Sequence, residues 1–168
     1  MALDASIGGT SSDSYVTIAV ADAYHATHLY SSVWTAASTD NKERSLKMAT
    51  RLLDERMTWN GSKHTDEQSL RWPRGFVTDY DGYSIETTEI PVAIQNATAE
   101  FARHLISADS TAESQGKGMD SLVAGSVSLS FSKTDTADVL PSIVQEMLRG
   151  WGTLHARAKF GSVAVVRT

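Results

Sequence analysis

At 168 residues with 41% hydrophobic content, the chain can bury one core of ordinary size, and two independent domains would each be marginal. It contains no cysteine, which excludes a disulfide framework and a thiolate metal site. The formal net charge of −5 argues against broad affinity for nucleic acid, because such affinity needs many Lys and Arg side chains that neutralise phosphates.

Membrane and secretory segments are not indicated. No apolar run approaches the ~20 residues that cross a bilayer. The N-terminal sequence lacks the basic region of a secretory signal. We therefore expect no membrane partner and synthesis in a cytoplasm.

The N-terminal segment predicts an arm followed by a helix. Residues 1–13 are small and polar, and they bury too little apolar surface to offset the entropy of ordering. We expect this segment to be a flexible arm. Thr17 is a candidate N-cap for a helix over residues 18–30, and Trp34 follows in a connector.

A second helix is predicted over residues 41–57, with Asp40 as its N-cap. Leu46, Ala49 and Leu53 share one face of it. Basic side chains lie on the other face, so we expect that face to be solvated.

The clearest helix begins near Pro91, which a first helical turn tolerates because its missing N–H would have no partner there. The apolar residues of this helix recur at steps of four, three, four and four: Ile90, Ile94, Ala97, Phe101 and Leu105. This spacing places them on one buried face. Before the helix, Asp81-Gly82 accepts the positive φ angles of a tight hairpin turn.

The C-terminal part predicts a linker, a strand, a helix and an arm. Residues 107–120 have the composition of a flexible linker. Residues 122–131 alternate polar and apolar side chains, which predicts a strand. A last helix follows Asp138, with Pro141 in its first turn. Residues 157–168 are predicted to be an extended arm that adds a strand to a neighbour.

These elements predict a mainly α fold, a small helical bundle with a β-hairpin and an extended C-terminal β arm. Residues 14–156 would form the helical domain between the two arms. We expect one domain, because two independent cores would each be marginal at this length, and no internal repeat is present.

Charge is unevenly distributed along the chain. Residues 76–90 carry four acids and no Lys or Arg, and residues 149–168 carry four basic residues and no acid. Complementary patches suit head-to-tail contacts between copies, although a solvated hairpin and tail would give the same distribution. The candidate interface residues are Asp79, Asp81, Glu86, Glu89, Arg157, Lys159, Phe160, Val163, Val165 and Arg167.

The search for catalytic and metal-binding motifs is negative. His25 and His28 lie three apart on one predicted helix, but no third metal ligand is indicated nearby. Asp79-Tyr80-Asp81-Gly82 differs from a calcium loop because its Gly comes fourth and not sixth. No Gly-x-Ser-x-Gly motif frames a serine. We predict no catalytic residue, no metal and no cofactor, and no enzyme activity.

The segment from Gln68 to Arg74 admits two interpretations. In the first, its apolar side chains pack in the core and its arginines are solvated or paired. In the second, Trp59, Trp72 and the arginines form a platform on which bases of single-stranded nucleic acid stack.

Several short segments resemble a known family. They are Ser14-Tyr15-Val16-Thr17, Ala21-Asp22-Ala23-Tyr24, Ala49-Thr50-Arg51-Leu52-Leu53-Asp54, Trp59-x-Gly61, Gln68-x-Leu70-x-Trp72-Pro73-Arg74 and Ile90-Pro91. This pattern resembles the head–tail connector (adaptor) proteins of tailed bacteriophages, some of whose relatives are labelled DnaT-like single-stranded-DNA-binding proteins. Val20 departs from it, since an acidic residue is expected there, and residues 151–168 extend beyond the usual end.

The resemblance implies a structural virion protein that is synthesised in the bacterial host cytoplasm and forms a homo-oligomeric, dodecameric ring in the neck between capsid and tail. Its partners would be other copies of the chain, the portal protein and a tail or stopper protein, with the double-stranded genome passing through without specific binding. An acidic chain suits a ring that does not grip phosphates. The alternative is a DnaT-like single-stranded-DNA-binding replication accessory protein.

Overall fold

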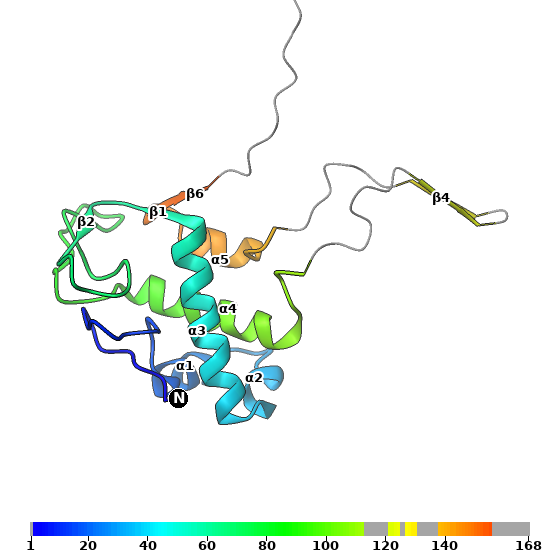
Figure 1. Cartoon of the computed structure of the whole chain (residues 1–168), viewed down its shortest axis with the longest axis horizontal. Coiled ribbons are helices and arrows are strands. Elements are labelled where there is room, and N and C mark those ends of the chain that lie inside the picture. Colours follow the sequence, from blue (N-terminus) through cyan, green and yellow to red (C-terminus); the bar gives the residue numbers. More distant parts are fainter. Residues whose placement is uncertain (1, 113–120, 125–126, 131–137, 156–168) are drawn as a thin grey trace, which may run out of the picture.

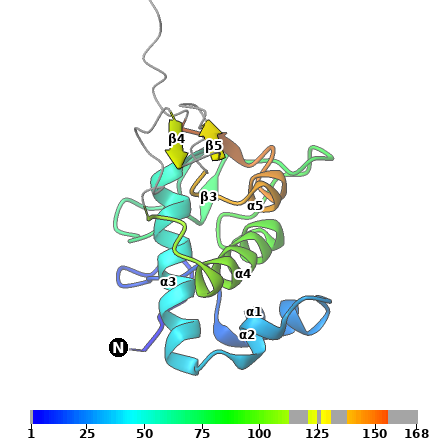
Figure 2. The ribbon, with the colours of Figure 1, turned by 90° about the vertical axis from the view of Figure 1, so that its right-hand side faces the viewer.

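The computed structural model of the chain describes residues 2–112, 121–124, 127–130 and 138–155. In this part of the chain the fold is mostly helical, with five helices and three small two-stranded antiparallel sheets. The long helices α3 (Thr39–Arg56) and α4 (Val92–Ser107) cross and pack against each other (Figure 1). The shorter helices that also pack against α4 are α1 (Ile18–Ala26), α2 (Ser32–Ala36) and α5 (Ser142–Met147) (Figure 2). The predicted mainly α fold is confirmed, with α4 at its centre.

The predicted apolar face of α4 is buried. Ile94, Ala97 and Phe101 are fully inaccessible to solvent, and Leu105 is partly buried against the same core. Pro91 takes the N-cap position, so the helix proper begins one residue later, at Val92.

The predicted bounds of the two preceding helices need correction. Thr17 caps α1 as predicted, but the helix ends at Ala26 and not at Tyr30. The N-cap of α3 is Ser38, whose hydroxyl accepts a hydrogen bond from the N–H of Asn41 (3.3 Å). Ser and Asp both cap helices well, and here the Asp lies inside the first turn, where a negative charge is favourable.

Trp34 also differs from its prediction, because it is a buried residue of α2 and not part of a connector. Its indole N–H donates to Asp22 Oδ1 (2.7 Å). Lys42 Nζ pairs with the same carboxylate (2.8 Å) and lies 5.1 Å from the centre of the indole ring. These contacts fix the short helix against its neighbours.

One of the three sheets joins segments far apart in the sequence, and the other two join segments close along the chain. In the first two, β1 (Met57–Trp59) pairs with β6 (Gly152–Leu154), and β2 (Ser62–Lys63) pairs with β3 (Arg74–Gly75). In the third, β4 (Ser121–Ala124) pairs with β5 (Val127–Ser130). The prediction of one strand over residues 122–131 is therefore wrong, because an alternating pattern is the same in one long strand and in two paired short ones.

The turn predicted at Asp81-Gly82 is present. Gly82 has a φ of 88°, and Asp79 Oδ1 accepts the N–H groups of Asp81 (3.0 Å) and Tyr83 (2.8 Å). One antiparallel bridge, between Thr78 and Ser84, forms below the turn. The hairpin is thus a tight turn with minimal strand pairing.

The N-terminal segment is hydrogen-bonded to the rest of the chain. The N–H of Ser69 donates to Gly9 O (3.1 Å), and Lys47 Nζ pairs with Asp13 Oδ2 (2.6 Å). These contacts differ from the expected flexible arm, because its polar side chains find partners within the chain. The predicted arm over residues 157–168 lies outside the described residues, as does most of the predicted linker, and the division into domains stays a prediction.

A partly buried carboxylate ties four segments together. Asp54 of α3 accepts hydrogen bonds from the hydroxyl of Tyr15, from Trp59 Nε1 (3.0 Å) and from the N–H of Arg71 (3.1 Å). Burial raises the pKa of Asp54 above its usual value, and the three donors act against that shift. One side chain thereby joins the N-terminal segment, α3, β1 and the loop before β3.

Among the described residues, no helix combines the length and the apolar character needed to cross a membrane. Of the two longest, α3 buries one face and presents charged or polar side chains on the other, whereas α4 is buried on all sides over residues 97–102 by the helices around it. Both are therefore helices of a packed bundle.

Phe101→Ala should lower the free energy of unfolding by about 3–5 kcal/mol, because truncation loses transfer energy and leaves a cavity in the core. Urea denaturation followed by circular dichroism measures this change. Val92→Ala, at a position of the same helix that is 68% exposed, is the control and should change stability by less than about 0.5 kcal/mol. Equal effects of the two substitutions would contradict the assigned core.

Asp54→Ala should lower the free energy of unfolding by about 2 kcal/mol, because two partly buried donors and one exposed donor lose a charged acceptor. The neighbouring Glu55→Ala is the matched control, since the Glu55 side chain is exposed. Denaturant unfolding of both variants gives the comparison. A loss below about 0.5 kcal/mol for Asp54→Ala would show that the carboxylate does not hold these segments together.

Candidate nucleic-acid interface

The tryptophans of the sequence signature are inside the protein. Trp59 and Trp72 are buried, and their rings meet edge to face with centroids 5.9 Å apart. The Trp151 ring also meets the Trp72 ring edge to face, with centroids 6.1 Å apart. Because their faces are covered by core side chains, these rings cannot serve as the stacking platform considered from the sequence.

Gln68 closes the loop between β2 and β3 from within. Its Nε2 donates to the carbonyls of Leu70 (2.9 Å) and Pro73 (3.1 Å), and its Oε1 accepts the N–H of Thr65 (3.0 Å). The side chain is buried, so each of these bonds satisfies a group that would otherwise lose its hydration. Gln68 is therefore a structural residue.

Arg74 is enclosed by main-chain carbonyls. Its guanidinium donates to the carbonyls of Asn60 (2.6 Å), Gly61 (2.6 Å) and Arg71 (3.1 Å). Burial lowers the pKa of Arg74 from its usual value. With its donors occupied in this way, Arg74 is not available for phosphates.

The other signature residues also shape the backbone. Gly61 has a φ of 68°, and a Cβ there would lie 2.2 Å from the carbonyl oxygen of Gly75, so only glycine fits. The Trp72–Pro73 peptide bond is cis, and Leu70 is partly buried against the core. Together these residues form a fixed base under the loop that follows β3.

That loop, residues 76–83, displays three aromatic side chains to solvent, and we call it the aromatic loop. Phe76 is 96% exposed, Tyr83 is 73% exposed and Tyr80 is 67% exposed. Phe76 also has a φ of 58°, a left-handed conformation that is uncommon for a bulky residue. An exposed ring on strained backbone marks a candidate functional position.

None of these three residues is predicted as a site residue from the sequence. Phe76 precedes the buried Val77, so in the sequence the pair resembles part of a core strand. The signal that was available is the concentration of three aromatic residues within eight positions around an Asp-Gly turn.

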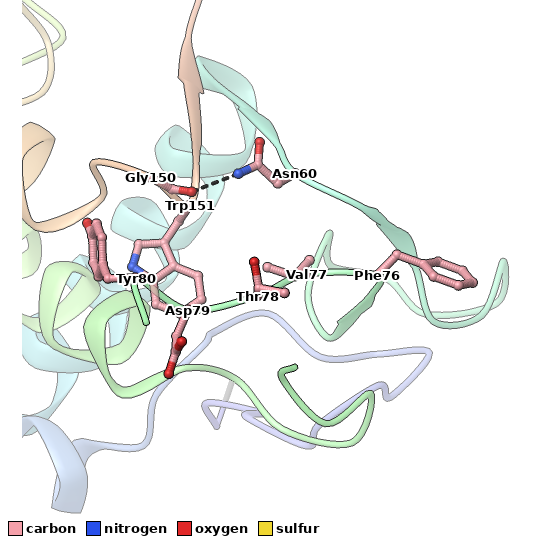
Figure 3. A pocket seen from close by; sticks show the side chains of 8 residues that line it. All are labelled: Asn60, Phe76, Val77, Thr78, Asp79, Tyr80, Gly150 and Trp151. Atoms are coloured by element: carbon pink, nitrogen blue, oxygen red, sulfur yellow. Dashed lines mark hydrogen bonds between the residues drawn. The ribbon is translucent and has the colours of Figure 1, made fainter. Parts of the chain in front are cut away.

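A cavity of about 230 Å³ lies beside the aromatic loop (Figure 3). The β1–β2 connection contributes Asn60 to its wall, and the segment after α5 contributes Gly150 and Trp151. Residues 76–80 complete the lining. The amide Nδ2 of Asn60 donates to Gly150 O (2.7 Å), which joins two of the walls.

The predicted charged interface is described only on its acidic side. Asp81, Glu86 and Glu89 are exposed, whereas Asp79 is half-buried and serves the turn through its Oδ1. The basic and apolar residues predicted to complement them, from Arg157 to Arg167, lie outside the described residues. The interface therefore stays a prediction.

The two histidines considered for a metal are structural in this fold. His25 is buried, and its Nε2 lies 3.1 Å from the carbonyl oxygen of Ala99. Burial lowers the pKa of His25, which favours the neutral ring. His28 Nε2 lies 3.7 Å from Glu100 Oε2, a carboxylate that also pairs with Arg103.

Comparison with known proteins gives one family. Residues 1–168 match the family described as "Putative DnaT-like ssDNA binding protein". No curated protein and no solved structure matches the chain.

This match corrects the prediction of a bacteriophage head–tail connector, because it assigns the whole chain to a family described by single-stranded-DNA binding. The predicted ring and the predicted portal and tail partners depended on the connector prediction and are wrong as well. The predicted neck location depended on the same prediction and is withdrawn with it. The signature residues could not separate the two families, since most of them build the interior of the fold. The family description names a binding activity and no reaction, and the chain belongs to this DnaT-like family.

Proposed function

We propose that the protein binds single-stranded DNA through the aromatic loop, and that it acts by binding and not by catalysis. Single-stranded DNA is the partner that the family description names. Proteins that hold single strands without sequence preference commonly stack successive bases on aromatic side chains. The aromatic loop is where the described surface offers such side chains close together.

The exposed rings carry the proposal. A Phe side chain that is 96% exposed leaves apolar surface in water that burial would remove, at a gain of ~25 cal/mol per Å². Covering Phe76 with a base face would recover that energy. Tyr80 and Tyr83 have a polar hydroxyl at the tip and a flat face, which suits a surface that is wet when free and stacked when bound.

The backbone supports the same site. The left-handed conformation of Phe76 costs free energy that the surrounding structure must supply, and such residues cluster at functional positions. Gly61 and Arg74 hold the chain just before it, through the close approach to Gly75 and the bonds to main-chain carbonyls. The ring is therefore presented from a rigid base, which reduces the entropy lost on binding.

Charge sets the mode of binding. The aromatic loop carries Asp79 and Asp81, and the chain as a whole has a net charge of −5. Arg149, beside the cavity, is paired with Glu146 (3.4 Å). Affinity in the proposed complex therefore comes from stacking more than from phosphate neutralisation, and few counterions are released.

Phe76→Ala should weaken binding of a fluorescein-labelled single-stranded oligonucleotide about 5- to 150-fold in fluorescence anisotropy, since stacking contributes ~1–3 kcal/mol per base. Leu29→Ala is the control, because Leu29 is 84% exposed and lies in the α1–α2 connection. Its affinity should equal that of the wild type. Wild-type protein that does not bind at 50 mM salt, or unchanged binding by Phe76→Ala, would refute the proposal.

The salt dependence of the same titration tests the mode of binding. A strand held mainly by stacking should give a slope of log Kobs against log salt no steeper than about −1.5, equivalent to roughly two phosphate contacts. A duplex of the same sequence should bind more weakly, because its bases are already stacked on one another. A slope of −4 or steeper would mean that phosphate contacts outside the aromatic loop dominate.

A further inference from the structure

The cavity beside the aromatic loop has the size of a single ring system. Its volume of about 230 Å³ lies below the ~300–1,000 Å³ of pockets that enclose drug-sized ligands. A nucleotide with its sugar and phosphate would not fit entirely, whereas one planar base would. The volume of the cavity therefore suits the base of a nucleotide and not the whole nucleotide.

The polar groups on its wall suit a neutral ligand that hydrogen-bonds. Asn60 uses its Nδ2 on Gly150, which leaves Oδ1 without a partner in the described part of the chain. Thr78 is exposed at the cavity and contributes a hydroxyl, which can donate and accept. The amide of Asn60 and the hydroxyl of Thr78 lie above and below the open space in Figure 3.

Trp151 adds an unused donor to the wall. Its Nε1 is buried and has no hydrogen-bond acceptor among the described residues. In Figure 3 this nitrogen lies on the side of the indole that faces Tyr80. The Tyr80 and Trp151 rings meet edge to face, with centroids 6.2 Å apart. Because Tyr80 is largely exposed, its ring can move, and an acceptor on a ligand could then reach the donor.

The charge of the wall excludes phosphate. Among the residues that line the cavity, Asp79 carries the only full charge, and it is negative. A phosphate would be repelled there, and no lining side chain would compensate it. The uncharged part of a nucleotide is therefore the part that the cavity can accept.

We propose that this cavity receives one unstacked base of the bound single strand, while the sugar and phosphate stay outside and the neighbouring base stacks on Phe76. This inference rests on the proposed function and adds a defined base-binding site to it. Asn60 Oδ1 accepts from a base N–H, and the Thr78 hydroxyl pairs with a ring nitrogen or a carbonyl. A strand held in this way has a fixed register at one nucleotide.

Thr78→Leu tests the inference, because it fills the cavity and removes the hydroxyl without adding an aromatic face. We expect single-stranded oligonucleotide binding to weaken about tenfold. Thr88→Leu is the matched control: Thr88 is also exposed, precedes α4 and does not line the cavity. Its affinity should be unchanged.

A second measurement uses free deoxynucleosides, which carry a base and no phosphate. Titrating them at millimolar concentration into ¹⁵N-labelled protein should shift the indole N–H signal of Trp151 more than those of Trp34, Trp59 and Trp72, and Thr78→Leu should abolish that shift.

The outcomes separate the two proposals. Wild-type protein that binds the oligonucleotide through Phe76, while the Trp151 signal stays still and Thr78→Leu binds normally, overturns the base-binding cavity and leaves the proposed function intact. Wild-type protein that binds no oligonucleotide overturns the proposed function and the cavity together.

Discussion

The partly buried carboxylate of Asp54 is the constraint on which the arrangement of the loops depends. A carboxylate taken out of water is costly unless its oxygens are hydrogen-bonded. Here the donors come from Tyr15, Trp59 and Arg71, which lie on three different segments. The three segments must therefore meet at one point for the charge to be tolerated. This requirement places the N-terminal segment and the β2–β3 loop against the end of α3.

The signature residues extend that fixed point to the surface. Trp59 and Trp72 contact each other in the core, and Arg74 binds the carbonyls of the turn that Gly61 makes. Two residues after Arg74 the chain reaches the surface at Phe76. The motif of Trp59 and the segment from Gln68 to Arg74, which in the sequence could be a binding platform, thus supports the aromatic loop from inside the fold. Substitutions in the motif would disturb a binding surface that its residues do not touch.

Elements with a strong local pattern could be predicted from the sequence. The 3.6-residue period of α4, the cap at Thr17 and the Asp-Gly turn depend on neighbours within one element. The cap of α3 was misplaced because Ser38 and Asp40 are both good caps. The role of Asp54 could not be found, since Tyr15 is 39 residues away and the pairing exists only after folding. Exposure of Phe76 was equally hidden, because a Phe beside a Val resembles core.

The acidic charge of the chain fits two opposite functions, and only the mechanism of binding separates them. Net negative charge argues against a protein that holds DNA mainly by its phosphates, and it suits a ring that DNA passes without contact. It does not exclude stacking, because a base face is uncharged and a single strand can turn its bases toward the protein. Acidic side chains among exposed rings even have a use in that arrangement. In the proposed complex Asp79 and Asp81 repel the backbone and leave the bases as the part of the strand that approaches the aromatic loop.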